Sequence, residues 1–564
     1  MKFSEFKYVR PDLDLIKSQY KDLTEKLISA KSAAEQLEIV KTFNKIADEV
    51  DSTFQIVYIK NSIDTTDEFI QKEQEFLDEA MPELQEYSVE FTKALNKSPF
   101  KAELEKSLGS LIFKQNELKE KTFKAEIIPL LQEQNKLVSA YGKLSASAQI
   151  EFEDQVYNLS QMRKFSSSTD RATRKNAAAA VSAWYQAHEA EFDDLYDKMV
   201  KVRQDIAVGL GFENYIQVAY YNMGRLDYNQ ADVKKFREQI LSEVVPFVQN
   251  ELMPRRAKRL GIKELKSYDL GLTFLNGNPT PKGDRAWAVN QAIEMYDEMS
   301  PETSKFFRML VDRELLDLDA KKGKMGGGYC TYIPQYEAPF IFANFNGTAD
   351  DVDVLTHEAG HAFQVYTSRN NLPELRWPTA EGAEIHSMSM EFLAWRWIDK
   401  FFKEDTNKYK FSHLADGVEI LCWIALVDHY QHEVYQNPSM SPTERKATWR
   451  KLEKQYQPWK VFEDDPFLES GAFWFRQGHI FEVPFYYIDY GLAQTIAFQF
   501  WVMSRNDFAD AWNKYYKLCQ IGGAMSFVEL LTKNGLDTPF TEGSLKKVMD
   551  PIKAYLQSID DSKF

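Results

Sequence analysis

The sequence is poor in cysteine, glycine and proline. Its 564 residues include only 3 cysteines, 24 glycines and 20 prolines. Cys330, Cys422 and Cys519 are too few for a disulfide framework, which fits a reducing compartment. Their spacing does not match a zinc finger. The scarcity of glycine and proline argues against collagen-like, disordered and many-stranded β architectures.

The sequence also lacks long apolar runs and an excess of basic charge. No apolar run approaches the ~18–20 residues that span a bilayer, and residues 1–7 lack the apolar core of a signal peptide. The 69 basic and 85 acidic residues give a net charge of −16, which repels nucleic-acid phosphates and anionic membranes. We therefore expect a cytoplasmic protein that binds neither nucleic acid nor membrane. These patterns do not predict an oligomeric state.

Most of the sequence favours helices. From residue 11 to about 270, Ala, Glu, Lys, Leu and Gln dominate, and apolar residues recur at helical spacing. One such stripe contains Ile16, Tyr20, Leu23 and Leu27. The length predicts more than one domain, and the polar, then alanine-rich stretch at 163–180 is a candidate hinge. We predict an N-terminal helical lobe over residues 1–180 and a second lobe over residues 181–564.

The pattern changes between residues 323 and 349. Glycines at 323 and 326–328 interrupt the helical pattern, and segments 329–333 and 339–345 are typical of short strands. Aspartates at 350, 351 and 353 form the acidic first turn expected at a helix start. The sequence therefore predicts a small β-ribbon that leads directly into a helix.

That helix carries a metal-binding motif, His357-Glu358-Ala359-Gly360-His361. Histidines four residues apart share one helical face, so both imidazoles can reach one tetrahedral zinc ion. Glu358 falls beside the metal, where it can take a proton from bound water. Chance predicts about 0.01 copies of this pattern in such a chain. Gly360 costs a helix ~1 kcal/mol relative to alanine, which indicates a packing or access role.

A hydrolytic zinc ion needs a third protein ligand and one open position. A second predicted helix begins near Ala380 and offers several candidates. Glu384 and Glu391 are seven residues apart and share a face, whereas His386 lies about 200° around the helix from Glu384. Spacing alone leaves Glu381, Glu384 and Glu391 as alternatives.

The two helices together resemble the thimet-oligopeptidase and oligoendopeptidase F family of zinc metallopeptidases. The chain length and helical N-terminal half are most similar to the oligoendopeptidase F and Pz-peptidase branch. In this family a ligand glutamate follows the first histidine by just under thirty residues and precedes a second glutamate by seven. The resemblance implies one zinc ion per chain, bound by His357, His361 and Glu384, with Glu391 as a supporting carboxylate. A metzincin is excluded, because the required Gly-x-x-His pattern does not follow His361.

A second cluster, at residues 479–491, resembles the family's histidine followed by a Tyr-x-x-Tyr pair. The resemblance implies that His479, Tyr487 and Tyr490 hydrogen-bond the oxyanion of the tetrahedral intermediate. A neutral phenol can donate to developing negative charge without first neutralising the zinc. We interpret the neighbouring Tyr486 as a core residue.

The strand Phe340–Phe345 resembles the family's edge strand beside the zinc helix. The resemblance implies that an extended peptide adds to this strand at Ala343, Asn344 and Phe345 through backbone hydrogen bonds. The glycines at 326–328 then form a mobile loop over the cleft.

Four other histidines do not form a metal motif. His429 and His432 are three residues apart, but the inverted zinc motif is absent, so we assign them to helix packing or polar contacts. His188 and His413 are isolated and are assigned no role.

The resemblance implies a mainly α fold, with a large two-lobed helical body, a β-ribbon beside the zinc helix and a deep substrate channel. Residues 181–564 then form the catalytic lobe of a zinc-dependent endopeptidase that hydrolyses short oligopeptides, with Glu358 as the proton carrier. A peptide-binding scaffold is the main alternative, but it is expected to lose Glu358 or a ligand. An exopeptidase needs a charged group that captures a peptide terminus, and Arg476 is a candidate. The sequence predicts no cleavage-site preference.

Overall fold

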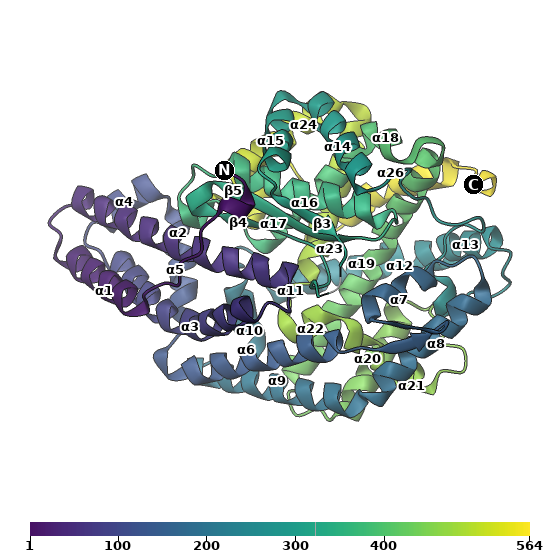
Figure 1. The fold of residues 1–564 in the computed structure, drawn as a ribbon, viewed down its shortest axis with the longest axis horizontal. Coiled ribbons are helices and arrows are strands. Elements are labelled where there is room, and N and C mark those ends of the chain that lie inside the picture. Colours follow the sequence, from purple (N-terminus) through teal and green to yellow (C-terminus); the bar gives the residue numbers. More distant parts are fainter. Residues whose placement is uncertain (322) are drawn as a thin grey trace.

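The computed structural model describes residues 1–321 and 323–564, and it is mainly helical (Figure 1). The predicted helices between residues 11 and 270 are confirmed, with a short antiparallel hairpin of β1 (Ile150–Phe152) and β2 (Gln155–Tyr157) as an addition. The first helices are α1 (Leu13–Ser29), α2 (Ala33–Ile63), α3 (Glu68–Asn96), α4 (Lys101–Leu108), α5 (Ser110–Lys121), α6 (Ile128–Ala146), α7 (Leu159–Ser166), α8 (Arg171–Ala187), α9 (Glu189–Leu210) and α10 (Tyr215–Asn222).

One long, irregular helical segment follows and leads to the sheet. It contains α11 (Gln230–Gln239), α12 (Val245–Phe247) and α13 (Met253–Arg259), with π-helical turns at Ile240–Val244 and Val248–Leu252 between them. The predicted loop at 276–284 is confirmed, because the next helix begins at residue 285 and Asp284 caps it. The helices after this loop are α14 (Arg285–Met299) and α15 (Pro301–Asp312).

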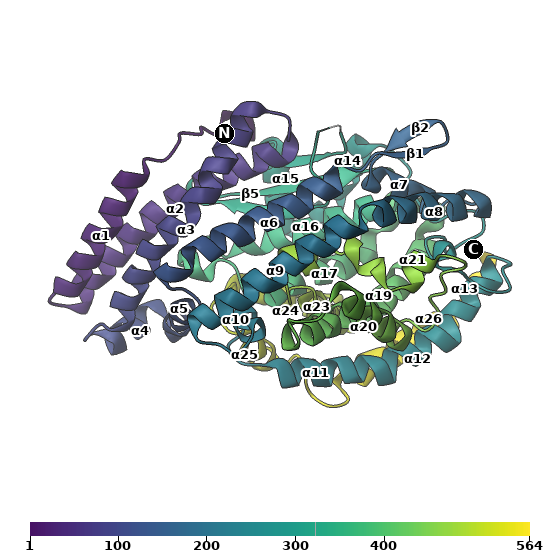
Figure 2. The same cartoon turned by 90° about the horizontal axis from the view of Figure 1, so that it is seen from below.

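Helices α1 to α5 enclose a hydrophobic core of their own. The stripe Ile16, Tyr20, Leu23 and Leu27 is buried in it, as the spacing predicts. Figures 1 and 2 both show these helices projecting from the remainder of the molecule, while α6 and α9 pack along the main body. Residues from α6 onward belong to a second, larger core. The boundary near residue 180 stays a prediction.

The small sheet is mixed and has three strands. They are β3 (Leu316–Asp319), β4 (Tyr329–Ile333) and β5 (Ala338–Phe345). The two predicted strands are confirmed as β4 and β5, which pair antiparallel with Tyr329 opposite Phe342. The sequence did not predict β3, which pairs parallel with the other side of β5. The strand order is therefore β3-β5-β4, and β5 is the central strand rather than an edge.

Three helices form the centre of the molecule behind this sheet. They are α16 (Asp350–Thr367), α17 (Ala380–Leu393) and α23 (Ile488–Asn506). Helix α16 packs against β5 and α17, and α17 packs against α23. The starts of α16 and α17 agree with the prediction. The remaining helices are α18 (Asp399–Phe402), α19 (Thr406–Gln436), α20 (Pro442–Tyr456), α21 (Pro466–Glu469), α22 (Gly478–Glu482), α24 (Phe508–Ile521), α25 (Phe527–Lys533) and α26 (Ser544–Ser558).

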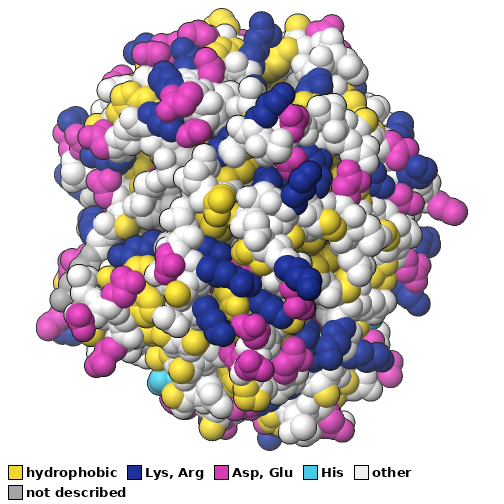
Figure 3. Space-filling model, turned by 90° about the vertical axis from the view of Figure 1, so that its right-hand side faces the viewer, with side chains coloured by type: hydrophobic (Ala, Val, Ile, Leu, Met, Phe, Trp, Pro, Cys, Tyr) yellow, Lys and Arg dark blue, Asp and Glu magenta, His cyan; other side chains and the backbone are white. Residues whose placement is uncertain are grey.

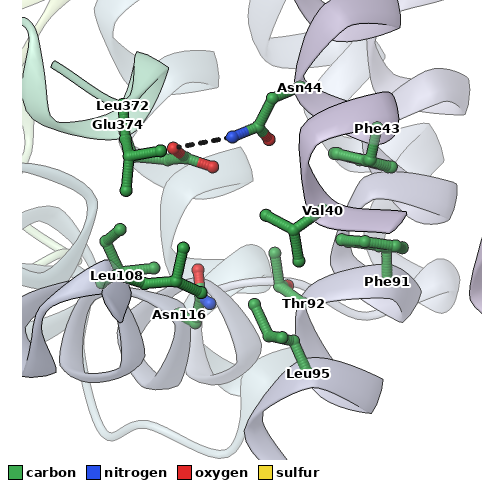
Figure 4. A pocket seen from close by; sticks show the side chains of 11 residues that line it. Val40, Phe43, Asn44, Phe91, Thr92, Leu95, Leu108, Asn116, Leu372 and Glu374 are labelled. Carbon is green, nitrogen blue, oxygen red and sulfur yellow. Dashed lines mark hydrogen bonds between the residues drawn. The ribbon is translucent and has the colours of Figure 1, made fainter. Parts of the chain in front are cut away.

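Helix α2 touches the link that joins α16 to α17. Asp48 of α2 accepts hydrogen bonds from the Arg376 guanidinium at 2.7 and 2.8 Å, and Asn44 donates to Glu374 at 3.4 Å. Figure 4 shows Asn44 and Glu374 on opposite sides of a small cavity that is otherwise lined mainly by apolar side chains. Its volume of about 20 Å³ suits one water molecule. The N-terminal helices are thus tied to the segment between two central helices.

Basic side chains gather in the middle of the face seen from the right-hand side of Figure 1, where α13 lies (Figure 3). The arginines of α13 pair with carboxylates. Arg255 lies 3.0 Å from Asp561, and Arg256 lies 3.1 Å from Glu419.

No helix among the described residues combines the length and the apolarity that crossing a bilayer requires.

Candidate metal centre and active site

Helices α16 and α17 bring His357, His361 and Glu384 together. One carboxylate oxygen, Glu384 Oε2, lies 3.2 Å from His357 Nε2 and 3.3 Å from His361 Nε2. Bonds of about 2.0–2.1 Å to a tetrahedral zinc place neighbouring ligand atoms about 3.3 Å apart. The two nitrogens and one oxygen therefore fit a zinc ion, and the partly exposed His357 leaves one side accessible.

Gly360 sets the distance between these two helices. A methyl group on Gly360 would lie 2.6 Å from the carbonyl oxygen of His386 and 2.7 Å from the Cα of Ser387. Only glycine permits this approach, which explains a helix-destabilising residue inside the motif. His386 itself points away from the metal site, as its spacing predicted, and its Nδ1 contacts the Gly382 carbonyl at 2.8 Å.

Glu391 orients one of the two histidines. Its Oε1 accepts from His357 Nδ1 at 2.7 Å, so the Nε2 of that ring is left free for a metal. Its Oε2 accepts from His413 Nε2 at 2.9 Å, and Trp395 Nε1 donates to His413 Nδ1 at 3.0 Å. Burial acts to raise the pKa of Glu391, but these histidines lower it overall. His413, to which the sequence assigned no role, therefore supports Glu391.

Glu381, the third alternative for a ligand, lies in a different cluster. Its side chain is fully buried, and neither carboxyl oxygen has a hydrogen-bond partner among the described residues. Arg225 lies nearby and donates to Asp489 at 2.7 Å and to the Phe485 carbonyl at 2.6 Å. Burial raises the pKa of both Glu381 and Asp489, whereas the charge of Arg225 acts to lower both.

Glu358 is buried beside His357, His361 and Glu384. Its Oε2 has no hydrogen-bond partner among the described residues, and its Oε1 lies 3.5 Å from the position of a methyl group on Gly328. Burial raises the pKa of Glu358, although the neighbouring His357 and His361 act in the opposite direction. An unpartnered carboxylate with a raised pKa suits a group that takes up and releases a proton.

The aromatic cluster lies against the same site. The Tyr486 hydroxyl donates to Glu384 Oε1 at 2.7 Å, so its interpretation as a core residue is wrong. The ring of His479 lies 4.8 Å from Tyr487 and 5.8 Å from both Tyr486 and Tyr490. Burial raises the pKa of Tyr490, and the charges of Glu384 and Glu358 raise it further.

Gln477 fixes the tautomer of His479. Trp423 Nε1 donates to Gln477 Oε1 at 2.9 Å, so the amide nitrogen of Gln477 faces His479 Nδ1, also at 2.9 Å. Nδ1 therefore accepts, and the ring proton sits on Nε2. Burial lowers the pKa of His479 to about 4, so the ring is a neutral donor at neutral pH. A loop residue two positions from a histidine carries no sequence signal for this role.

The predicted peptide-binding strand needs correction. Strand β5 is central rather than an edge, but β4 pairs with it only as far as Phe342, so peptide binding at Ala343, Asn344 and Phe345 stays a prediction. The Ala343 carbonyl accepts from Lys324 Nζ at 2.6 Å, and the Asn344 amide donates to the carbonyls of Met325 and Gly327 at 2.8 Å. Ala343 and Asn344 therefore hold the glycine-rich segment in place. Phe345, at the end of β5, packs on the large core. The sequence could not exclude β3, which occupies the second side of β5.

The remaining histidines and cysteines lie outside the metal site. His432 is buried and contacts Tyr220 at 3.2 Å and Arg237 at 2.9 Å, and His429 contacts Tyr456 at 3.1 Å. Both make the polar packing contacts that the sequence favoured. The three cysteines are free thiols, and burial raises the pKa of each.

Models of two protein families match the chain. The model of the Peptidase M3 N-terminal domain matches residues 3–123, and that of Peptidase family M3 matches residues 164–550. The second match alone spans more than half of the chain and contains all of the predicted metal and catalytic residues.

Curated relatives match over part of their length. An oligoendopeptidase F homolog of Borreliella burgdorferi is 24% identical over 410 residues, which cover 70% of this chain and 66% of that relative. The group B oligopeptidase PepB of Streptococcus agalactiae is 25% identical over 263 residues, which cover 44% of this chain and 41% of that relative. The chain thus spans less than two thirds of the length of either relative.

Solved structures match along the whole chain. Pz peptidase A, solved with an inhibitor, is 47% identical, with a TM-score of 0.97 and 100% coverage of both chains. The oligoendopeptidase-F of Enterococcus faecium is 17% identical, with a TM-score of 0.67 over 98% of this chain and 97% of that one. The second similarity shows a shared fold alone.

Proposed function

The chain belongs to peptidase family M3, and on this premise we propose that it is a zinc-dependent endopeptidase that hydrolyses short peptides. One observation carries the proposal. Glu384 Oε2 lies 3.2 and 3.3 Å from the Nε2 atoms of His357 and His361, and Glu358 is buried beside them without a partner. This arrangement combines a three-ligand metal site, one open side and an available proton carrier.

The chain's own residues have distinct roles in this proposal. Zinc, when bound, would act as a Lewis acid that polarises the substrate carbonyl and lowers the pKa of water. Glu358 takes a proton from the attacking water and delivers it to the leaving amine. His479 donates a hydrogen bond from Nε2 to the developing oxyanion. The phenolic hydroxyls of Tyr490 and Tyr487 donate hydrogen bonds to the same oxyanion. Tyr486 holds the carboxylate of Glu384 in place.

The substrate class follows from the family and from the expected channel. Two lobes around a deep channel would exclude folded proteins and admit short, extended peptides. We therefore expect zinc-dependent cleavage of peptides of roughly ten residues and negligible cleavage of a folded protein.

The variant Glu358→Gln tests the proposal. It should retain near-stoichiometric zinc, measured by elemental analysis, while kcat for a short internally quenched peptide falls about 10²–10⁴-fold, as for loss of a general base. The exposed Glu38→Gln serves as the control and should behave as the wild type. Substantial turnover by Glu358→Gln would remove Glu358 as the base. A zinc-free, inactive wild type would instead favour the scaffold alternative.

A further inference from the structure

Arg476 has no carboxylate partner among the described residues. It lies near the aromatic cluster of His479, Tyr486, Tyr487 and Tyr490. It ends a short 3-10 helix at Ala472–Arg476, and it makes no hydrogen bond or ion pair with the described residues. Its guanidinium carbon lies 3.9 Å from the ring centroid of Phe473 and 5.4 Å from that of Tyr185. Stacking on these rings fixes the plane of the guanidinium and leaves its N–H edge free for a carboxylate.

The position of Arg476 follows from its neighbours in the chain. Gln477 contacts His479 at 2.9 Å, and the ring of His479 lies 4.8 Å from that of Tyr487. The Cα atoms of Arg476 and His479 are three residues apart, so at most about 11 Å separate them. Arg476 therefore lies close in space to His479, one of the proposed oxyanion donors.

Arg476 is exposed to solvent and yet surrounded by protein. Its side chain is exposed, but desolvation by the surrounding chain lowers its pKa. The closest acidic groups have partners of their own, because Glu453 contacts Arg450 at 3.1 Å and Asp465 accepts from Ser182 at 2.6 Å.

A second arginine, on helix α7, acts electrostatically on Arg476. Arg163 is exposed and makes no ion pair with the described residues, and its charge acts on the pKa of Arg476, Tyr185 and Tyr487. On the same helix, Ser160 Oγ lies 3.4 Å from the position of a methyl group on Gly326. Helix α7 thus reaches from the glycine-rich segment near Glu358 to the side of Tyr487.

Two neighbouring guanidinium groups repel each other, and an anion between them relieves that repulsion. The chain has a net charge of −16. Two arginines without ion pairs among the described residues therefore mark a local site of positive charge near the aromatic cluster. We propose that Arg476, assisted by Arg163, binds a carboxylate of the peptide substrate and so selects which bond reaches the metal site.

This inference rests on the proposed function and adds to it the chemistry of one subsite. An extended peptide advances about 3.3 Å per residue, so the bound carboxylate lies a few residues from the cleaved bond. The carboxylate comes either from the peptide C-terminus or from an Asp or Glu side chain, and both present the same two oxygens. A C-terminal carboxylate would fix the distance between the cleavage site and the end of the peptide.

Binding to a non-hydrolysing holoenzyme tests the inference without turnover. In the zinc-loaded Glu358→Gln background, we would measure by fluorescence anisotropy the Kd of one labelled peptide as the free acid and as the C-terminal amide. A second pair carries an internal Glu or Gln in an amidated peptide. Each pair is measured with Arg476→Gln, Arg476→Lys and Arg163→Gln. Arg505→Gln is the matched control, since Arg505 is also exposed, unpaired among the described residues and stacked on aromatic rings.

We expect the carboxylate form of one pair to bind about tenfold to a hundredfold more tightly than its neutral form, as for a charge-assisted hydrogen bond. Arg476→Gln should abolish this ratio, Arg163→Gln should reduce it, Arg476→Lys should keep part of it and Arg505→Gln should leave it intact. The pair that responds identifies the source of the carboxylate. Equal Kd values within both pairs, or ratios unchanged in Arg476→Gln, would overturn the inference. If the wild type showed no chelator-sensitive hydrolysis, the proposed function would be refuted. The binding ratios would still decide the inference.

Discussion

Replacing Gly360 by alanine should weaken zinc binding while the protein still folds. The new methyl group would lie 2.6 Å from the His386 carbonyl oxygen, whereas ordinary contact begins at 3.4 Å. Helices α16 and α17 must therefore separate by close to 0.8 Å at this point. Glu384 lies on the same helix, only two residues before His386, so it moves with that helix and away from the two histidines.

The substitution has two energetic consequences, which can be measured separately. Metal–ligand distances tolerate deviations of about 0.2 Å, so a displacement several times larger should cost about tenfold to a hundredfold in zinc affinity. For stability, overpacking costs about 1–3 kcal/mol. Alanine regains ~1 kcal/mol relative to glycine in a helix interior. The free energy of unfolding of the apoprotein should therefore fall by no more than about 2 kcal/mol.

Competition with a chromophoric chelator measures the zinc affinity, and denaturant unfolding of the apoprotein measures stability. Gly142→Ala is the matched control, because Gly142 lies inside α6 and its added methyl group meets no atom within 4 Å. This control should keep the zinc affinity of the wild type and gain up to about 1 kcal/mol of stability. If Gly360→Ala bound zinc as tightly as Gly142→Ala, the role of Gly360 in setting ligand geometry would be disproved.

Three further substitutions test other contacts. Tyr486→Phe removes the 2.7 Å hydrogen bond to Glu384, which should cost about 1.5–3 kcal/mol of zinc-binding free energy, and an unchanged affinity by chelator competition would contradict this contact. His413→Leu should lower zinc affinity about 10–100-fold without removing a ligand, and wild-type affinity would mean that its support of the metal site is negligible. Asp428→Asn leaves Arg237 buried without its counter-charge and should lower the free energy of unfolding by about 3–5 kcal/mol at pH 7. Burial acts to raise the pKa of Asp428, but His432 and Arg237 lower it overall. The wild type should therefore lose this stabilisation as the pH falls below about 4. Equal acid sensitivity of both proteins in denaturant titrations would refute the assignment.

The pairing of His357 with His361 was predictable because it follows a local rule. Histidines four apart on a helix share one face whatever surrounds them, so this pair needed no tertiary information. The choice of Glu384 among three glutamates did need it. Only the packing of α16 on α17 separates Glu384 from Glu381, and the resemblance supplied that information.

The supporting contacts were hidden for the same reason. His413 lies 22 residues beyond Glu391, and Tyr486 lies 102 residues beyond Glu384, so no spacing rule connects either pair. Tyr486 also resembles core residues in an aromatic run. The strand order was misjudged because Leu316–Asp319 is short and pairs in parallel, at a distance in the sequence that periodicity does not report.

The contact of α2 with the segment between α16 and α17 makes the two halves of the chain mechanically interdependent. Asp48 holds Arg376, and the same helix reaches the sheet, where Thr331 donates to Gln55 at 2.6 Å. Helix α2 therefore contacts both the sheet and the segment that joins α16 to α17. We therefore expect that removal of α2 would loosen the segment between α16 and α17 and change the distances among His357, His361 and Glu384.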